Sequence, residues 1–95
     1  MNTYKFRLNN KNKLWYLNNE IHRAHDRPAI IWVNGSKSWC QHGKHHRDND
    51  KPAIIHSEGS KVWYQHGEKH RDNDKPAIIW SDGRVEYWVN HEKIK

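Results

Sequence analysis

The chain of 95 residues is long enough for one domain of ordinary size, and this length excludes a second compact domain. Hydrophobic residues make up only 34% of it, yet six Trp and four Tyr favour ordered aromatic packing over disorder. The formal charge of +6 favours acidic partners, and the single cysteine excludes an intramolecular disulfide.

Residues 4–13 are the first predicted element, a degenerate half of a unit that then recurs along the chain. The phrase HRDNDKPAII occupies residues 46–55 and 70–79 unchanged, and a near copy, HRAHDRPAII, occupies residues 22–31. Matching positions recur with a period of 24: Pro28, Pro52 and Pro76; Gly35, Gly59 and Gly83; Trp15, Trp39, Trp63 and Tyr87. We therefore divide the single repeat domain 1–95 into an opening half-unit (4–13), three repeats (14–37, 38–61 and 62–84) and a closing half-unit (85–95).

Each repeat contains a predicted β-hairpin. Asn34-Gly35, Glu58-Gly59 and Asp82-Gly83 join runs of β-branched and aromatic residues, which is a signal for a two-residue type I′ turn. Such a turn pairs large apolar residues across the strands: Phe6 with Trp15, Ile30 with Trp39, Ile54 with Trp63, and Ile78 with Tyr87. A G1 bulge at the glycine would instead shift this pairing by one residue.

This pattern predicts an all-β protein made of one elongated, twisted antiparallel sheet of repeated hairpins, with seven or eight strands. Trp15, Trp39 and Trp63 are expected to pack in its core as structural residues. At a strand spacing near 4.8 Å, the repeats and half-units would form a rod about 40 Å long.

The phrase that repeats most faithfully connects one hairpin to the next. His66-Gly67 predicts a turn, and Pro76 suits the first residue of the following strand. A catalytic site is usually one unique constellation, so equal copies favour a structural loop. We expect two sets of side chains to brace it through hydrogen bonds: His22, His46 and His70, and Asp26, Asp50 and Asp74.

Metal and catalytic interpretations of the same residues are weaker. The nine His include His42, His45 and His46, but there is no Cys pair and no His-x-x-x-His on a predicted helix. The DND triplets lack the turn Gly and distal Glu of a calcium loop. Cys40 stands at an aromatic position of the repeat and is interpreted as a packing residue. We therefore expect no metal, no cofactor and no enzymatic activity.

The segment WYQHGEKHRDNDKPAIIWSDG resembles the divergent MORN-type repeats. Tyr64-x-x-Gly67-x-x-His70 and Asp82-Gly83 match that pattern. The segment more closely resembles a Gly-x-x-His-Arg…Pro-Ala variant of bacterial, bacteriophage and large-DNA-virus proteins. The resemblance covers about residues 14–91 and departs where Asn19 replaces Gly and Cys40 replaces Tyr. It implies an elongated sheet of antiparallel hairpins with an interaction role and no fixed ligand.

These features predict a non-enzymatic module that binds another protein, one that is acidic or associated with nucleic acid. The side chains expected to contact it are Arg23, Arg47, Arg71, Tyr16, Tyr64 and Trp88. Small size and the resemblance suggest a viral or phage accessory protein that inhibits a host or defence enzyme. An uncovered apolar face of a thin sheet would also favour homo-oligomers.

Nucleic-acid binding is the alternative function. Regularly spaced aromatic residues could stack on bases while Lys13, Lys37, Lys61 and the repeated Arg neutralise phosphates. A membrane role is not expected, because no amphipathic helix or lipidation motif is present. The start, MNTYKFRLNNK, has no apolar run, so a cytoplasmic location is expected, in the host cytoplasm for a viral or phage protein.

Overall fold

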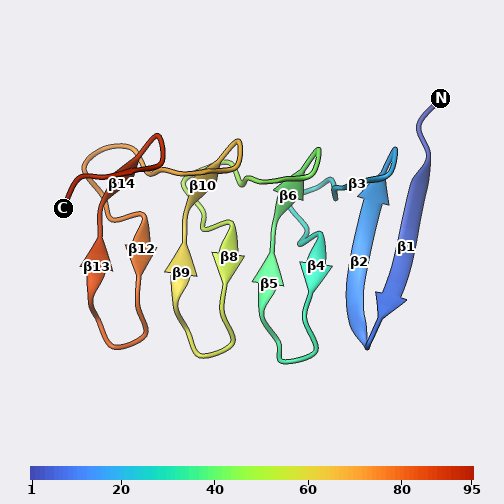
Figure 1. The fold of residues 1–95 in the computed structure, drawn as a ribbon, viewed down its shortest axis with the longest axis horizontal. Coiled ribbons are helices and arrows are strands. Elements are labelled where there is room, and N and C mark those ends of the chain that lie inside the picture. Colours follow the sequence, from blue (N-terminus) through green and yellow to red (C-terminus); the bar gives the residue numbers. More distant parts are fainter.

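The computed structural model describes all 95 residues, and every regular element in it is a β-strand (Figure 1). Hairpins lie side by side in chain order, with the N-terminus at one end of the row and the C-terminus at the other (Figure 1). The molecule measures 41 × 29 × 19 Å, so the expected length of the array is confirmed. The predicted all-β class with a main antiparallel sheet of linked hairpins is also confirmed.

The main sheet is formed by one long hairpin from each unit. Its antiparallel strands follow chain order: β1 (Tyr4–Asn9), β2 (Asn12–Leu17), β4 (Ile30–Ile31), β5 (Lys37–Ser38), β8 (Ile54–Ile55), β9 (Lys61–Val62), β12 (Ile78–Ile79) and β13 (Val85–Glu86). β3 (Glu20–Ile21) pairs with the end of β2 outside this path. Consecutive repeats are thus joined by backbone pairing, as in β5 with β8.

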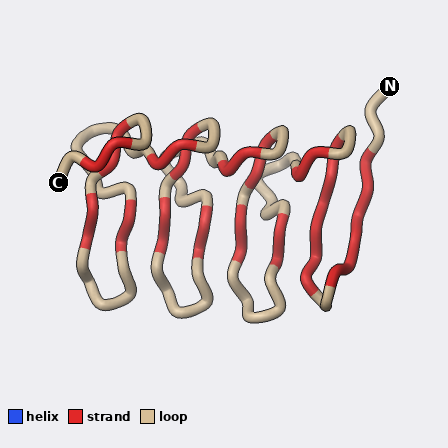
Figure 2. Tube along the Cα trace, in the orientation of Figure 1, coloured by secondary structure: helices blue, strands red, loops and turns tan.

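A second set of short hairpins forms a row along one end of the long hairpins (Figure 2). The strand pairs are β6 (Cys40–Gln41) with β7 (Lys44–His45), β10 (Tyr64–Gln65) with β11 (Glu68–Lys69), and β14 (Trp88–Val89) with β15 (Glu92–Lys93). The turn predicted at His66-Gly67 is confirmed, and both residues have positive φ, at 52° and 83°. Two successive positive φ angles are typical of a type I′ turn.

The cross-strand pairing predicted for the three repeats is wrong by one residue. Ile30 lies opposite Ser38, Ile54 opposite Val62, and Ile78 opposite Glu86. The prediction is confirmed in the first hairpin, where Phe6 lies opposite Trp15.

The cause of the shift is the turn at each repeated glycine. Gly35 N–H donates to the carbonyl of Trp32 at 2.9 Å, and Trp32 N–H donates to the carbonyl of Ser36 at 2.8 Å. Gly35 alone has positive φ, at 93°, so the turn is a three-residue loop with a G1 bulge rather than a type I′ turn. In the first hairpin, Asn10 and Lys11 both have positive φ, and the two-residue turn keeps the expected pairing.

The core is thin and follows the array. Trp39 and Trp63 are only 7% and 6% exposed, whereas Trp15 is half-buried. Ala29, Ala53 and Ala77 are fully buried, one in each repeat. The backbone N–H of Trp39 donates to the carbonyl of Ala53 at 2.7 Å, so buried residues of successive repeats adjoin one another.

Candidate functional site

The contact between successive repeats is built around an aspartate. The Arg47 guanidinium lies 3.7 Å over the ring of Trp39, a cation–π arrangement. Its Nε and Nη2 donate to Asp26 Oδ1 and Oδ2 at 2.8 and 3.3 Å, and its Nη1 donates to the carbonyl of Pro52. Lys51 Nζ contacts Asp26 Oδ2 at 2.8 Å. Arg47 therefore holds together its own loop and the loop of the preceding repeat.

The backbone of the aspartate is bound as well as its side chain. Trp39 Nε1 donates to the carbonyl of Asp26 at 3.0 Å. We call this arrangement the aspartate clamp, in which Trp39, Arg47 and Lys51 bind Asp26. It recurs one repeat later around Asp50, where the bonds from Arg71 Nε and Lys75 Nζ measure 2.9 and 3.0 Å. Trp63 Nε1 donates to the Asp50 carbonyl at 3.0 Å, and its ring lies 3.9 Å from the Arg71 guanidinium.

The clamp strongly favours the ionised carboxylate. Hydrogen bonds from Arg47 and then Lys51 lower the pKa of Asp26 to about 2, and Arg71 and Lys75 do the same for Asp50. The Arg47 side chain is 13% exposed, so its donors are largely removed from water. An unpaired guanidinium in this position would lose stabilisation that water could not fully replace.

Histidines make a second contact between repeats. His46 Nδ1 accepts the backbone N–H of His66 at 3.0 Å, and its Nε2 lies 2.8 Å from Asp48 Oδ1. This pattern requires the tautomer that carries its proton on Nε2. The equivalent acceptors His22 and His70 bind the backbone N–H of His42 and Asn90. Burial, and then the nearby His42, lower the pKa of His22.

The first repeat holds the parts of a clamp without its aspartate. Arg23 lies 3.7 Å over Trp15, and its Nη1 donates to the carbonyl of Pro28, as in the later repeats. Arg23 Nε and Nη2 and Trp15 Nε1 donate to no protein acceptor. The residue 24 positions before Asp26 is Asn2, whose side-chain oxygen instead accepts from Asn18 Nδ2 at 3.2 Å.

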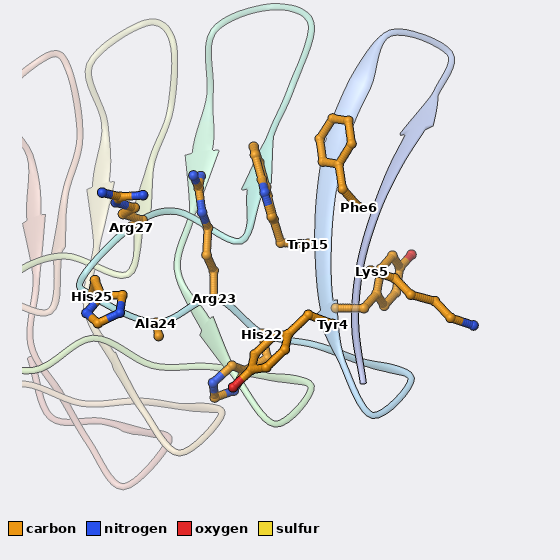
Figure 3. Close-up of a pocket in the computed structure, with 10 residues that line it drawn as sticks. Tyr4, Lys5, Phe6, Trp15, His22, Arg23, Ala24, His25 and Arg27 are labelled. Atoms are coloured by element: carbon orange, nitrogen blue, oxygen red, sulfur yellow. The ribbon is translucent and has the colours of Figure 1, made fainter. Parts of the chain in front are cut away.

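Trp15 and Arg23 line a cavity of about 500 Å³ at the N-terminal end of the array. Figure 3 shows Trp15 between Phe6 and Arg23, and the rings of Phe6 and Trp15 lie 5.0 Å apart. Arg27, which is exposed, also lines the cavity. It stands one full repeat before Lys51 and therefore corresponds to the lysine of the clamp.

An apolar stripe on β1 continues from this cavity. Tyr4, Phe6 and Leu8 alternate along the strand on one face and are 68%, 50% and 66% exposed. Ile30, which corresponds to Phe6, is only 6% exposed. The outer edge of β1 pairs with no other strand. We call the region formed by Tyr4, Phe6, Leu8, Trp15, Arg23 and Arg27 the N-terminal surface.

The six side chains predicted to contact a partner do not meet in one place. Each of the three Arg lies in its own repeat, and only Arg23 and Tyr16 share the N-terminal cavity. The ring of Tyr64 lies 5.1 Å from that of His45, and Trp88 Nε1 donates to Glu86 at 2.9 Å. Of the expected structural aspartates, Asp74 differs from the others, because its side chain is 80% exposed and contacts only Lys95.

Sequence reasoning missed Arg27 and the stripe on β1. A signal was present in the repeat positions. Arg27 is in register with Lys51 and Lys75, whereas Asn2 stands where the later repeats have an aspartate. The replacement of the repeated aspartate by Asn2 therefore indicates that the N-terminal end differs from the later repeats.

Other chemistry has little support in the structure. No three His, Cys, Asp or Glu side chains are grouped so that they could hold a metal ion. Burial raises the pKa of the Cys40 thiol to about 11, which disfavours the reactive thiolate. The structure contains no helix that is long and apolar enough to cross a membrane.

No family model, curated protein or solved structure matches the chain.

Proposed function

We propose that this protein is a non-enzymatic interaction module that binds another protein through its N-terminal surface. The observation that carries the proposal is the exposed stripe of Tyr4, Phe6 and Leu8 on an unpaired edge strand, directly beside a cavity. Exposed apolar groups and free strand edges are typical of surfaces that contact other proteins.

The structure of the repeats favours a protein over a nucleic acid. Arg47 and Arg71 cover one face of Trp39 and Trp63, and both indoles are buried, so these rings are poorly placed to stack on bases. Asp48 and the equivalent Asp72 have side chains that are 77% exposed and would repel phosphates. The positive net charge is compatible with an acidic protein partner.

The resemblance to MORN-type repeats supports the same function, since such repeats usually serve interactions. The Gly-x-x-His-Arg…Pro-Ala variant that the chain resembles is seen in bacterial, phage and viral proteins. We extend the proposal on this basis to a small accessory protein that acts in the cytoplasm by inhibiting a host or defence enzyme. Nucleic-acid binding and self-association through the N-terminal surface are the alternatives that the experiment must separate.

The test is affinity capture with two matched double variants. Tyr4→Ser with Leu8→Ser removes apolar groups from the N-terminal surface, and Val33→Ser with Ile94→Ser removes groups that are 66% and 57% exposed elsewhere. A protein partner retained by the wild type after nuclease treatment should be lost by the first variant and kept by the second. Thermal melting should show that both variants remain folded.

Three other outcomes would contradict the proposal or redirect it. Retention that disappears with nuclease, together with oligonucleotide affinity that falls steeply with salt, would favour nucleic-acid binding. Equal loss in both double variants would show that the N-terminal surface is not the contact. A wild-type dimer that the first variant dissociates, measured by light scattering, would identify the partner as a second copy.

A further inference from the structure

The array contains a template for what the N-terminal cavity can bind. In the aspartate clamp, one residue supplies every acceptor: Asp26 Oδ1 and Oδ2 accept from Arg47, and the Asp26 carbonyl accepts from Trp39 Nε1. Lys51 adds a third contact to the carboxylate. The clamp therefore recognises an aspartate by its side chain and its backbone together.

The same donors stand at the N-terminal end. Trp15, Arg23 and Arg27 precede Trp39, Arg47 and Lys51 by one full repeat. Arg23 has the same position over its indole as Arg47, with 3.7 Å in both cases. Its Nη1 makes the same bond to a loop carbonyl, at 3.2 Å to Pro28. The guanidinium is thus held in the orientation that binds a carboxylate in the later repeats.

The remaining properties of the cavity match an acidic peptide segment. Its volume of about 500 Å³ lies within the range of about 300 to 1,000 Å³ that is common for ligand sites. Tyr4 and Phe6 supply apolar walls, and no Asp or Glu lines the cavity. Burial and the nearby Arg27 lower the pKa of Arg23, and a bound carboxylate would offset this repulsion between cations.

The template also defines the backbone that would carry the carboxylate. Asp26 has φ 55° and the preceding His25 has φ 63°; Asp50 and Asn49 have φ 58° and 64°. Two successive residues with positive φ form a tight turn, for which Asn, Asp and Gly are best suited. A turn of this kind places the carboxylate and the carbonyl of one aspartate on the same side of the chain, as the clamp requires.

We infer that the cavity lined by Trp15, Arg23 and Arg27 is a receptor for an aspartate that a partner protein presents on a tight turn. This inference rests on the proposed function and specifies its recognition chemistry. Arg23 Nε and Nη2 bind the carboxylate, Arg27 adds a second cation, and Trp15 Nε1 binds the carbonyl of the same residue. The stripe of Tyr4 and Phe6 packs against the flanking residues of that turn.

The direct test is a nuclear magnetic resonance titration of the full chain with a cyclic peptide that carries an Asn-Asp turn. The indole N–H signal of Trp15 and the Nε–H signal of Arg23 should shift. The indole signals of Trp39 and Trp63 should not, because these groups already donate to Asp26 and Asp50. The same peptide with Asn in place of the Asp should bind about tenfold more weakly or worse.

Substitutions in the receptor should weaken peptide binding in a defined order. Arg23→Gln and Arg27→Gln should each raise the dissociation constant, with about tenfold or more for Arg23→Gln, since it removes the bidentate pair. Arg84→Gln is the control, because its side chain is 74% exposed and lies in the last hairpin. Arg27 is exposed and makes no side-chain hydrogen bond, so Arg27→Gln should fold even where Arg23→Gln does not.

Several results would overturn the inference. They are an unchanged Trp15 signal with the aspartate peptide, equal affinity for the asparagine peptide, and an equal loss of binding in Arg84→Gln. Inorganic phosphate that shifts the Arg23 signal more than the peptide does would also contradict it. A captured partner that Arg23→Gln and Arg27→Gln still retain, but that the Tyr4 and Leu8 variant loses, would contradict the receptor and leave the proposed function standing.

Discussion

Arg47 Nε donates a hydrogen bond to Asp26 Oδ1 over 2.8 Å, although 21 positions separate the two residues in the chain. Arg71 makes the same bond to Asp50 at 2.9 Å. Each pair joins a repeat to the loop of the repeat before it. The residues that recur most faithfully in the sequence therefore stabilise the junctions between repeats, where damage to one unit is expected to reach its neighbour.

Asp26→Ala should lower the free energy of unfolding by about 1 to 3 kcal/mol, because Arg47 would remain largely buried without its carboxylate partner. Asp74→Ala removes the corresponding group of the last repeat and is the matched control. Its side chain is 80% exposed and contacts only Lys95, so its loss should cost at most about 1 kcal/mol. Chemical denaturation measures both values, and equal losses would show that the clamp adds no stability.

The two clamped aspartates predict acid sensitivity. Their pKa values are lowered from 3.8 to about 2, so the folded state binds fewer protons than the unfolded state in this window. The stabilisation from the two ionised carboxylates should be fully present above the unfolded pKa of 3.8 and be lost as pH falls toward about 2. Across this pH range, the melting temperature of the double variant Asp26→Asn with Asp50→Asn should change less than that of the wild type. A parallel pH dependence would contradict the assignment.

His22 predicts a second loss of stability at milder acidity. Its pKa lies below the ordinary value of 6.5, and Nδ1 must stay unprotonated to accept the N–H of His42. The unfolded chain therefore takes up the proton first, so stability is complete above 6.5 and falls as pH drops toward the lower folded value. His22→Asn keeps an acceptor near Nδ1 but cannot be protonated. It should reduce the slope of stability against pH, whereas His22→Ala should lower stability even at neutral pH.

Gly35→Ala should destabilise the fold by about 1 to 2 kcal/mol, because Gly35 has φ 93° in the bulged turn. Lack of space is not the reason, since an added Cβ would be 3.9 Å from its nearest neighbour, the Cβ of Ser57. Gly35→Asn should cost less, because Asn tolerates positive φ better than Ala does. Urea denaturation of the two variants tests this order, and an alanine variant as stable as the wild type would exclude the bulged turn.

The sequence by itself determined the period, the all-β class and the length of the array. These properties depend on patterns within one unit, such as the β-branched residues that flank Gly35, and on the regular recurrence of Pro and Trp from unit to unit. Strand spacing then gives a length that needs no knowledge of long-range contacts.

Only the tertiary structure decided the register. A glycine permits both the two-residue turn and the bulged one, and the two differ by a single residue. The pairing of each hairpin with its neighbours, for example Trp39 N–H with the carbonyl of Ala53, accompanies the bulged form. Local turn signals could not distinguish these alternatives, because the glycine has positive φ in both kinds of turn.

The roles of the arginines also depend on contacts between neighbouring repeats. Arg23 and Arg47 follow a histidine in nearly identical phrases, so the sequence assigned them one common role. In the structure, Arg47 is paired with the aspartate of the preceding loop, whereas Arg23 lines a cavity at the end of the array. The difference arises because a repeated side chain takes its partner from the adjacent unit. One repeat before Asp26 stands Asn2, whose side chain bonds to Asn18 instead.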